Sequence, residues 1–185
     1  MVRVVLVPIG DVPNKQLSDL AKGLEQVIYN SKVVVSKEPL KPPENALDLA
    51  RGQYLASEIL RRIAKAYGDP FKHLCLGVTT LDLYAPGLNF IFGEADRIEG
   101  VAIVSSHRLK ASFYGGPEDE RLLNERLLKE AVHEVGHLLG LPHCKGPSCV
   151  MRFSNWIGEV DAKEVKFCPN CNNKVKTSSK DFVLF

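Results

Sequence analysis

The segment His133–His143 contains three histidines, one glutamate and two glycines at a spacing that suits a catalytic zinc ion. On a helix that turns about 100° per residue, His133 and His137 project within about 40° of each other, so two imidazoles can bind one metal ion. Glu134 points away from this pair but can reach a water molecule at the metal. That placement is typical of a general base.

A third ligand needs a change of chain direction after the helix. His143 lies too far along the chain from His137 to share its helical face. Gly140 can adopt a positive φ and end the helix, and Pro142 stiffens the return, so His143 can complete the site. Three protein ligands leave a fourth position open to water, which is typical of catalytic zinc. The extended spacing HExxHxxGxxH is much more specific than HExxH alone, so unrelated surface histidines are a poor explanation.

Four cysteines after this segment form two pairs with metal-ligand spacing. Cys144 and Cys149 are separated by four residues and Cys168 and Cys171 by two, which suits a tetrahedral structural zinc. Two alternatives stay open. Disulfides are less favoured in a chain without secretory features, and a redox CxxC pair normally precedes a helix in a βαβ unit, which this region is not expected to offer. Cys75 lies in an apolar run and is expected to be a packed, inert strand residue.

The histidine motif followed by Met151 resembles the metzincin clan of zinc metalloproteases, and the four cysteines make the chain similar to the archaemetzincins in particular. The resemblance implies that the three histidines hold the catalytic zinc, that Glu134 is base and later proton donor, and that Met151 lies beneath the histidines as the Met-turn residue. It implies a peptidase that acts on peptide or protein substrates and binds two Zn²⁺ per chain.

One position departs from a related pattern. Two residues after Met151, where astacin-type metzincins carry a tyrosine that can reach zinc, this chain has Phe153, which has no hydroxyl group. Oxyanion stabilisation must therefore come from elsewhere. The resemblance also places a strand, Asn89–Phe92, at the sheet edge above the cleft. Candidate substrate or oxyanion contacts are Arg108, Tyr84, Asn89 and Phe90, although a surface arginine and a packed tyrosine are the commoner outcomes for the first two.

Composition is that of an ordinary globular protein with 185 residues, 45% hydrophobic and 25% charged, which is enough for one domain with a sizeable core. The net charge of +2 does not favour nucleic acid or an anionic membrane as a partner. The apolar start, Val2–Pro8, is too short for a secretory signal, and no run approaches transmembrane length. We expect a cytoplasmic monomer.

The alternation of strand and helix patterns predicts a mixed α/β (α+β) fold with an open mixed sheet, two long helices above the cleft and a small zinc-stapled C-terminal lobe, and the resemblance implies that this fold is metzincin-like. We expect one metalloprotease domain, 1–185, divided into an upper lobe, 1–140, that carries the active-site helix and a C-terminal lobe, 141–185, that is short on periodicity. The predicted strands are Val2–Pro8, Lys32–Ser36, Leu74–Leu83, Asn89–Phe92 and Val101–Ser106, and the predicted helices are Gln16–Tyr29, Glu44–Tyr67 and Glu118–Leu139.

Two other functions are compatible with these residues. The first is a zinc hydrolase that acts on a non-peptide amide or small molecule, which a narrow, closed cleft would favour. The second is a non-catalytic, zinc-stabilised binding module, which needs a fourth protein ligand at the histidines or a blocked cleft. A long cleft lined by a free strand edge would favour a peptidase instead.

Overall fold

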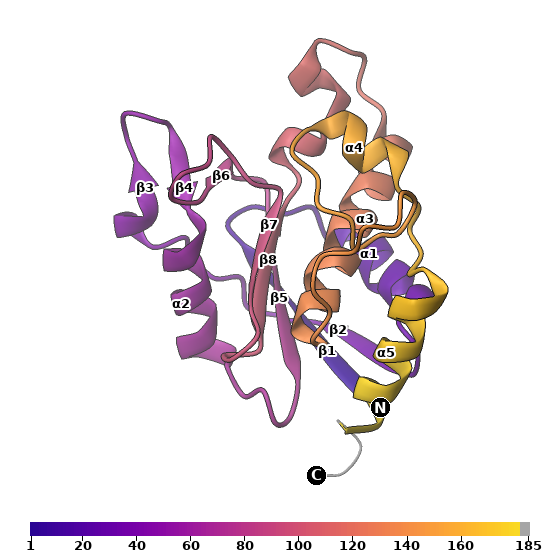
Figure 1. Ribbon diagram of the computed structural model, residues 1–185. Coiled ribbons are helices and arrows are strands. Elements are labelled where there is room, and N and C mark those ends of the chain that lie inside the picture. The colour runs from indigo at the N-terminus through magenta and orange to yellow at the C-terminus, as the bar shows by residue number, and fades with distance from the viewer. Residues whose placement is uncertain (182–185) are drawn as a thin grey trace.

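A five-stranded sheet in the order β2-β1-β5-β8-β7 is the framework of the protein (Figure 1). The computed structural model describes the backbone of residues 1–181 and the side chains of residues 1–177. Four strands run parallel, and β7 pairs antiparallel with β8 at one edge of the sheet. The strands are β1 (Val2–Ile9), β2 (Ser31–Val35), β5 (Leu74–Thr79), β7 (Gly93–Asp96) and β8 (Val101–Ser105).

Helices cover both faces of this sheet (Figure 1). Helices α1 (Asn14–Val27) and α3 (Glu120–Leu138) pack on one face, and α2 (Ala56–Tyr67) packs on the other. Because side chains alternate along a strand, Val4 and Leu6 of β1 join the core beneath α1 and α3, whereas Val7 joins the core beneath α2. Strands buried on both faces read as apolar runs, which is why the sequence predicts β1 and β8 well. The predicted strand Leu74–Leu83 is too long, because β5 ends at Thr79 and Leu83 lies in a separate short strand.

The predicted helix Glu44–Tyr67 is wrong in its first half, because only the part from Ala56 onward is α-helical. The Asp48 carboxylate accepts hydrogen bonds from the backbone N–H groups two and three residues further on, at 3.0 and 3.1 Å, and Gly52 has a φ of +65°. Such local bonds compete with the helix and turn the chain back. In place of the first half of this helix the chain forms a one-turn 3-10 helix, η1 (Glu44–Ala46), and two short strands, β3 (Leu47–Asp48) and β4 (Gln53–Leu55). A third strand from further along the chain, β6 (Leu83–Tyr84), completes a small sheet in the order β3-β4-β6.

The edge strand also lies later than predicted. Strand β7 begins at Gly93, directly after the predicted strand Asn89–Phe92. The Asn89 carbonyl accepts hydrogen bonds from the side chains of Arg51 at 2.8 Å and Gln53 at 3.0 Å. Asn89 and Ile91 are therefore tied to the small sheet, whereas the Phe92 carbonyl accepts from the Ser105 N–H at the end of β8 at 2.8 Å. Two short 3-10 helices follow β8: η2 (His107–Leu109) and η3 (Ala111–Tyr114).

The C-terminal region is more regular than the sequence suggests. It contains α4 (Ile157–Ala162) and α5 (Pro169–Asp181), and Cys168 directly precedes α5. The CxxC pair thus stands at the start of a helix, but no βαβ unit surrounds it within residues 1–181. In α5 only Cys171 and Val175 are buried apolar positions among the described side chains, so the sequence carries little helical periodicity. The last four residues of the predicted C-terminal lobe lie outside the described residues.

Membrane-spanning potential can be judged from the helices of residues 1–181. None of them is both long enough and apolar enough to cross a bilayer.

Candidate metal centres and active-site cleft

Three histidines converge at the C-terminal end of α3. His133 and His137 lie one turn apart on the helix, and His143 reaches them from the segment that follows it. The Nε2 atoms of His133 and His137 are 3.0 Å apart, and the three ring centroids are 4.6, 4.8 and 5.3 Å apart. One ring nitrogen from each histidine lies within 4.8 Å of the other two. Together they could hold one metal ion.

Two backbone carbonyls orient the helical histidines. His133 Nδ1 lies 2.8 Å from the Val150 carbonyl and His137 Nδ1 lies 2.8 Å from the Leu141 carbonyl. Since a carbonyl only accepts, each Nδ1 carries the proton and each Nε2 keeps its lone pair for a metal. Burial lowers the pKa of His133 well below its usual value and also lowers the pKa of His137, so both rings are held neutral, as ligands must be.

The turn that delivers His143 is built as the sequence predicts. Gly140 has a φ of +90°, and its N–H donates to the His137 carbonyl at 2.9 Å. The next N–H, from Leu141, donates to the Gly136 carbonyl at 3.0 Å. A glycine in this left-handed conformation ends the helix without steric strain, so the chain can return toward the metal ligands.

The carboxylate of Glu134 packs against the edge strand. A Cβ atom added to Gly93 of β7 would lie 2.6 Å from Glu134 Oε1 and 2.7 Å from the Ile103 carbonyl oxygen. Only glycine therefore leaves room for the carboxylate at this point. Burial, reinforced by the nearby Glu130 carboxylate, raises the pKa of Glu134 well above its usual range. A cation at the histidines would oppose that shift.

Met151 lies fully buried against α3. A Cβ atom added to Gly136 would collide with the Met151 sulfur, so the glycine allows the methionine to approach the helix backbone between His133 and His137. Sequence reasoning did not single out Gly136 or Gly93, because the requirement for a small residue arises from a neighbour that is distant along the chain.

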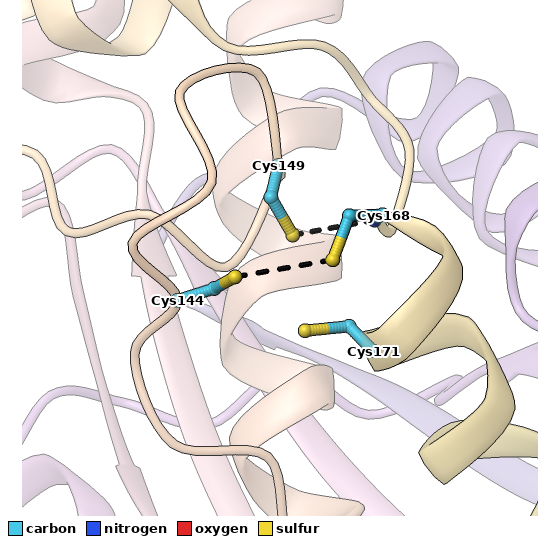
Figure 2. Close-up of side chains that lie close together, drawn as sticks. All are labelled: Cys144, Cys149, Cys168 and Cys171. Atoms are coloured by element: carbon cyan, nitrogen blue, oxygen red, sulfur yellow. Dashed lines mark hydrogen bonds between the residues drawn. The ribbon is translucent and has the colours of Figure 1, made fainter.

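Four thiols form a second cluster (Figure 2). The thiols point toward one another, with Cys144 and Cys149 on the loop after α3 and Cys168 and Cys171 at the start of α5. All four sulfurs lie within 4.8 Å of one another, and Cys144 Sγ is 3.9 Å from Cys168 Sγ. Four thiolates about 2.3 Å from a tetrahedral zinc ion would be about 3.8 Å apart, so the donor set fits that metal. All five cysteines of the chain are unpaired, which does not support the disulfide alternative.

Backbone N–H groups further favour thiolates in this cluster. The N–H of Cys168 points at Cys149 Sγ at 3.3 Å, and the N–H of Gly146 points at Cys144 Sγ at 3.4 Å. At the start of α5, the Cys171 N–H donates a hydrogen bond to the Cys168 sulfur. This bond lowers the pKa of the Cys168 thiol to about 7. A thiolate, not a thiol, is the form that binds zinc.

The histidines and Glu134 lie in an open cleft of about 850 Å³. One wall is the loop before β7 together with β7 itself, and the other comprises α3 and the segments that follow it. Strand β7 pairs with β8 on one side only, and no other strand within residues 1–181 pairs with it. The cleft is therefore bordered by a sheet edge.

The four candidate substrate contacts divide into two groups. Asn89 and Phe90 line the cleft, whereas Arg108 and Tyr84 do not. Arg108 makes a two-pronged ion pair with Asp82 at 2.7 and 2.8 Å, and its guanidinium lies 4.4 Å from the Phe90 ring centroid. The ring of Tyr84 lies under the Arg51 guanidinium, also at 4.4 Å. Arg108 and Tyr84 thus belong to a network behind the rim of the cleft.

A buried ion pair at the cleft has no signal in the sequence. Lys163 Nζ, from the segment after α4, lies 2.8 Å from Glu130 Oε1 on α3, and Glu130 lines the cleft. Neither residue belongs to a motif, and lysine is normally exposed, so spacing alone could not have paired them.

Comparison with known proteins agrees with this geometry. The profile of peptidase family M54 matches residues 3–177. An archaemetzincin from Pyrococcus furiosus is 43% identical over 176 residues, which are 94% of this chain and 92% of that protein. A zinc-dependent peptidase from Methanocorpusculum labreanum has 32% identity and a TM-score of 0.85, covering 93% of this chain and 99% of that one.

A second solved structure gives the same result. An archaemetzincin from Archaeoglobus fulgidus, in complex with malonate, is 39% identical with a TM-score of 0.79, and the match covers 93% of this chain and 99% of that one. The metzincin-like α/β fold expected from the sequence is therefore confirmed. Family profile, sequence identity and fold coincide over almost the whole chain, which therefore belongs to the archaemetzincin family, peptidase family M54.

Proposed function

We propose that His133, His137 and His143 hold the catalytic zinc ion of this zinc-dependent peptidase and that Glu134 is its general base. The observation that carries the assignment is the convergence of three neutral imidazoles beside one buried carboxylate in a single open cleft. Among the described residues, the histidine group contains no fourth protein ligand, which argues against a purely structural site.

The chemistry then divides between the metal and the chain. A zinc ion held by His133, His137 and His143 would supply a Lewis acid, which polarises a carbonyl and lowers the pKa of water. A Glu134 carboxylate oxygen accepts a proton as water adds its oxygen to the carbonyl carbon. Glu134 then gives that proton to the leaving amine nitrogen as the C–N bond breaks. Val150 and Leu141 keep the imidazole rings in the correct tautomer throughout, by accepting from Nδ1.

The shape of the cleft supports a peptide as the substrate. An extended peptide can pair with the free edge of β7, because backbone N–H and C=O groups at a sheet edge are available for hydrogen bonds. The cleft is open and bordered by this edge, whereas a hydrolase of small amides would be expected to enclose its substrate. We therefore prefer a peptide or protein substrate to a small molecule.

We further propose that the chain binds a second, structural zinc ion through Cys144, Cys149, Cys168 and Cys171. The 3.9 Å separation of two of the sulfurs and the N–H groups directed at them support this. This zinc would join the loop after α3 to the start of α5 and so stabilise the C-terminal lobe.

The wider setting is also part of the proposal. The chain acts as one domain with an upper lobe, 1–140, and a C-terminal lobe, 141–185, on the two sides of the cleft. It works as a monomer, because every group at the histidine site comes from one chain. A cytoplasmic location suits its five unpaired cysteines. Neither nucleic acid nor membrane is a partner of a chain with so small a net charge.

A peptide-library digest tests the function. Zinc-loaded protein and its Glu134→Gln variant are each incubated with a mixed peptide library, and products are identified by mass spectrometry. Cleavage products with the wild type and none with the variant support the assignment. Products that are equally abundant with both proteins, or an absence of products with zinc-loaded wild type, would refute it.

A further inference from the structure

The ion pair between Glu130 and Lys163 is not used by the hydrolytic chemistry. The side chains are 5% and 0% exposed, and Lys163 Nζ lies 2.8 Å from Glu130 Oε1. Replacing a buried ion pair by well-packed apolar residues is often neutral or stabilising, because desolvation of two charges offsets their attraction. Stability alone is therefore a weak explanation for a charged pair at this position.

Glu130 lies where a substrate side chain would meet it. It precedes Glu134 by one helical turn, so both carboxylates belong to the same side of α3 and both line the cleft. The segment Phe153–Asn155 also lines the cleft. Lys163 connects this segment to α3, because its ammonium also donates to the Arg152 carbonyl at 3.2 Å.

The carboxylate keeps capacity to accept hydrogen bonds. Glu130 Oε1 accepts a hydrogen bond from the Lys163 ammonium at 2.8 Å, and this oxygen has no other partner among the described residues. Ser154 Oγ, in the segment Phe153–Asn155, is buried without a hydrogen-bond partner among the described residues. Burial raises the pKa of Glu130, and Lys163 opposes that rise. The lysine therefore serves to keep a charged acceptor in a desolvated position.

We propose that Glu130 is a specificity-determining residue, which selects a substrate side chain that donates hydrogen bonds, such as lysine or glutamine, at one position next to the scissile bond. This inference rests on the proposed peptidase function. An apolar side chain at that position would leave the remaining acceptor capacity of Glu130 Oε1 and the Ser154 hydroxyl desolvated without a partner, and unsatisfied buried polar groups discriminate strongly between substrates.

The test compares peptides that differ only in hydrogen-bonding capacity. A library first locates the position where donors are preferred, and matched peptides then carry lysine or norleucine, and glutamine or methionine, at that position. We expect wild-type kcat/KM to favour the donor of each pair by about 10–100-fold. In Glu130→Met/Lys163→Met, which replaces the pair by apolar side chains of similar length, we expect this ratio to fall to one or below.

A matched control separates specificity from structure. Arg126 and Asp161 also form an ion pair, at 2.7 Å, that joins α3 to α4, and neither lines the cleft. Arg126→Met/Asp161→Leu should leave the donor preference unchanged, whatever its effect on thermal stability. Equal changes in preference in both double variants, or an unchanged preference in the Glu130/Lys163 variant, would overturn the proposal. Zinc content is measured in every variant by elemental analysis.

Two further measurements keep the result decisive. If the double variant does not fold, Glu130→Gln must lower the same ratio, because the amide replaces an acceptor oxygen by a donor; an unchanged ratio overturns the proposal. Dissociation constants of the same peptide pairs for the zinc-loaded Glu134→Gln protein measure the donor preference of the subsite in the absence of turnover. Donor-selective binding, together with an absence of peptidase activity in the zinc-loaded wild type, would reject the proposed function and keep the subsite, whereas unselective or absent binding rejects the subsite.

Discussion

The backbone N–H of Cys144 donates a hydrogen bond to the Met151 carbonyl at 2.9 Å. This bond joins the two metal clusters. Cys144 directly follows His143, and Met151 lies against α3 beside the other two histidines. The preceding residue, Val150, holds His133 through its carbonyl at 2.8 Å. One short segment is thus bonded both to a histidine of the first cluster and to a cysteine of the second.

This connection predicts that damage to the cysteine cluster weakens the histidine cluster. In Cys144→Ser we expect zinc affinity of the histidine site to fall by about 10–100-fold, the usual size of a defect in the groups that support a metal ligand. Competition with a chromophoric chelator measures the affinity. Lys145→Ser, at the exposed neighbouring position, is the control and should bind as the wild type does. Equal affinities in Cys144→Ser and wild type would show that the cysteine site is only a local staple.

The role of Glu134 predicts a variant that binds metal but is nearly inactive. Glu134→Gln keeps the shape of the side chain but cannot accept a proton, so kcat/KM should fall by about 10²–10⁴ or more. Zinc content and thermal stability should stay close to wild type. Glu120→Gln, at the exposed start of the same helix, should retain full activity. Loss of zinc in Glu134→Gln would contradict the assignment, because a general base is not a ligand.

The two clusters predict two zinc ions that differ in lability. The histidine site keeps an open coordination position, so a chelator should remove its metal first. The cysteine site should lose its metal more slowly, and that loss should unfold the C-terminal lobe. Elemental analysis during stepwise chelation, with circular dichroism on the same samples, measures both. One zinc per fully loaded chain would contradict the prediction.

The contact between Gly93 and Glu134 predicts a defect in turnover without a defect in metal binding. In Gly93→Ala the new methyl group must displace the carboxylate, since the Ile103 carbonyl on its other side is fixed in the sheet. Misplacing a general base can cost about 10²-fold in rate. Steady-state kinetics and zinc content provide the measurement. Gly116→Ala is the control, because its nearest neighbour would be 3.3 Å away and Gly116 is outside the cleft lining.

Burial of Cys75 predicts an inert thiol and a stability loss at high pH. Burial raises the pKa of Cys75 to about 12, above the usual value near 9. The folded state therefore holds the thiol proton between about pH 9 and 12 while the unfolded state releases it, so the stability due to this group falls as pH rises through that range. Peptide mapping after iodoacetamide treatment at pH 8 should find Cys75 unmodified in native protein and modified in guanidinium chloride. Rapid labelling of native Cys75 would refute this.

Much of the histidine site follows from local rules. A helix places His133, Glu134 and His137 in a fixed angular relation whatever surrounds it, and a glycine with positive φ ends that helix wherever it occurs. The spacing therefore predicts a metal site before any tertiary contact is known. Strands β1 and β8 are predictable for a similar reason, because burial on both faces leaves an apolar run.

The errors have local causes that a periodicity reading overlooks. The predicted helix Glu44–Tyr67 contains the turn around Asp48, where a side chain competes with the helix for backbone N–H groups. Helix α5 buries little and so carries almost no apolar period. Around Asp48 the turn chemistry outweighs the hydrophobic pattern, and in α5 the hydrophobic pattern is too weak to indicate a helix.

The sequence by itself determined which residues can hold metal, because ligand type and spacing are properties of the chain. Only the tertiary structure decided that Gly93 must be small, that Glu130 faces Lys163 and that Arg108 binds Asp82 behind the rim and does not line the cleft. These pairs join different elements of the fold. No local periodicity links such partners, since they meet only when packing brings distant segments together and desolvates their charges.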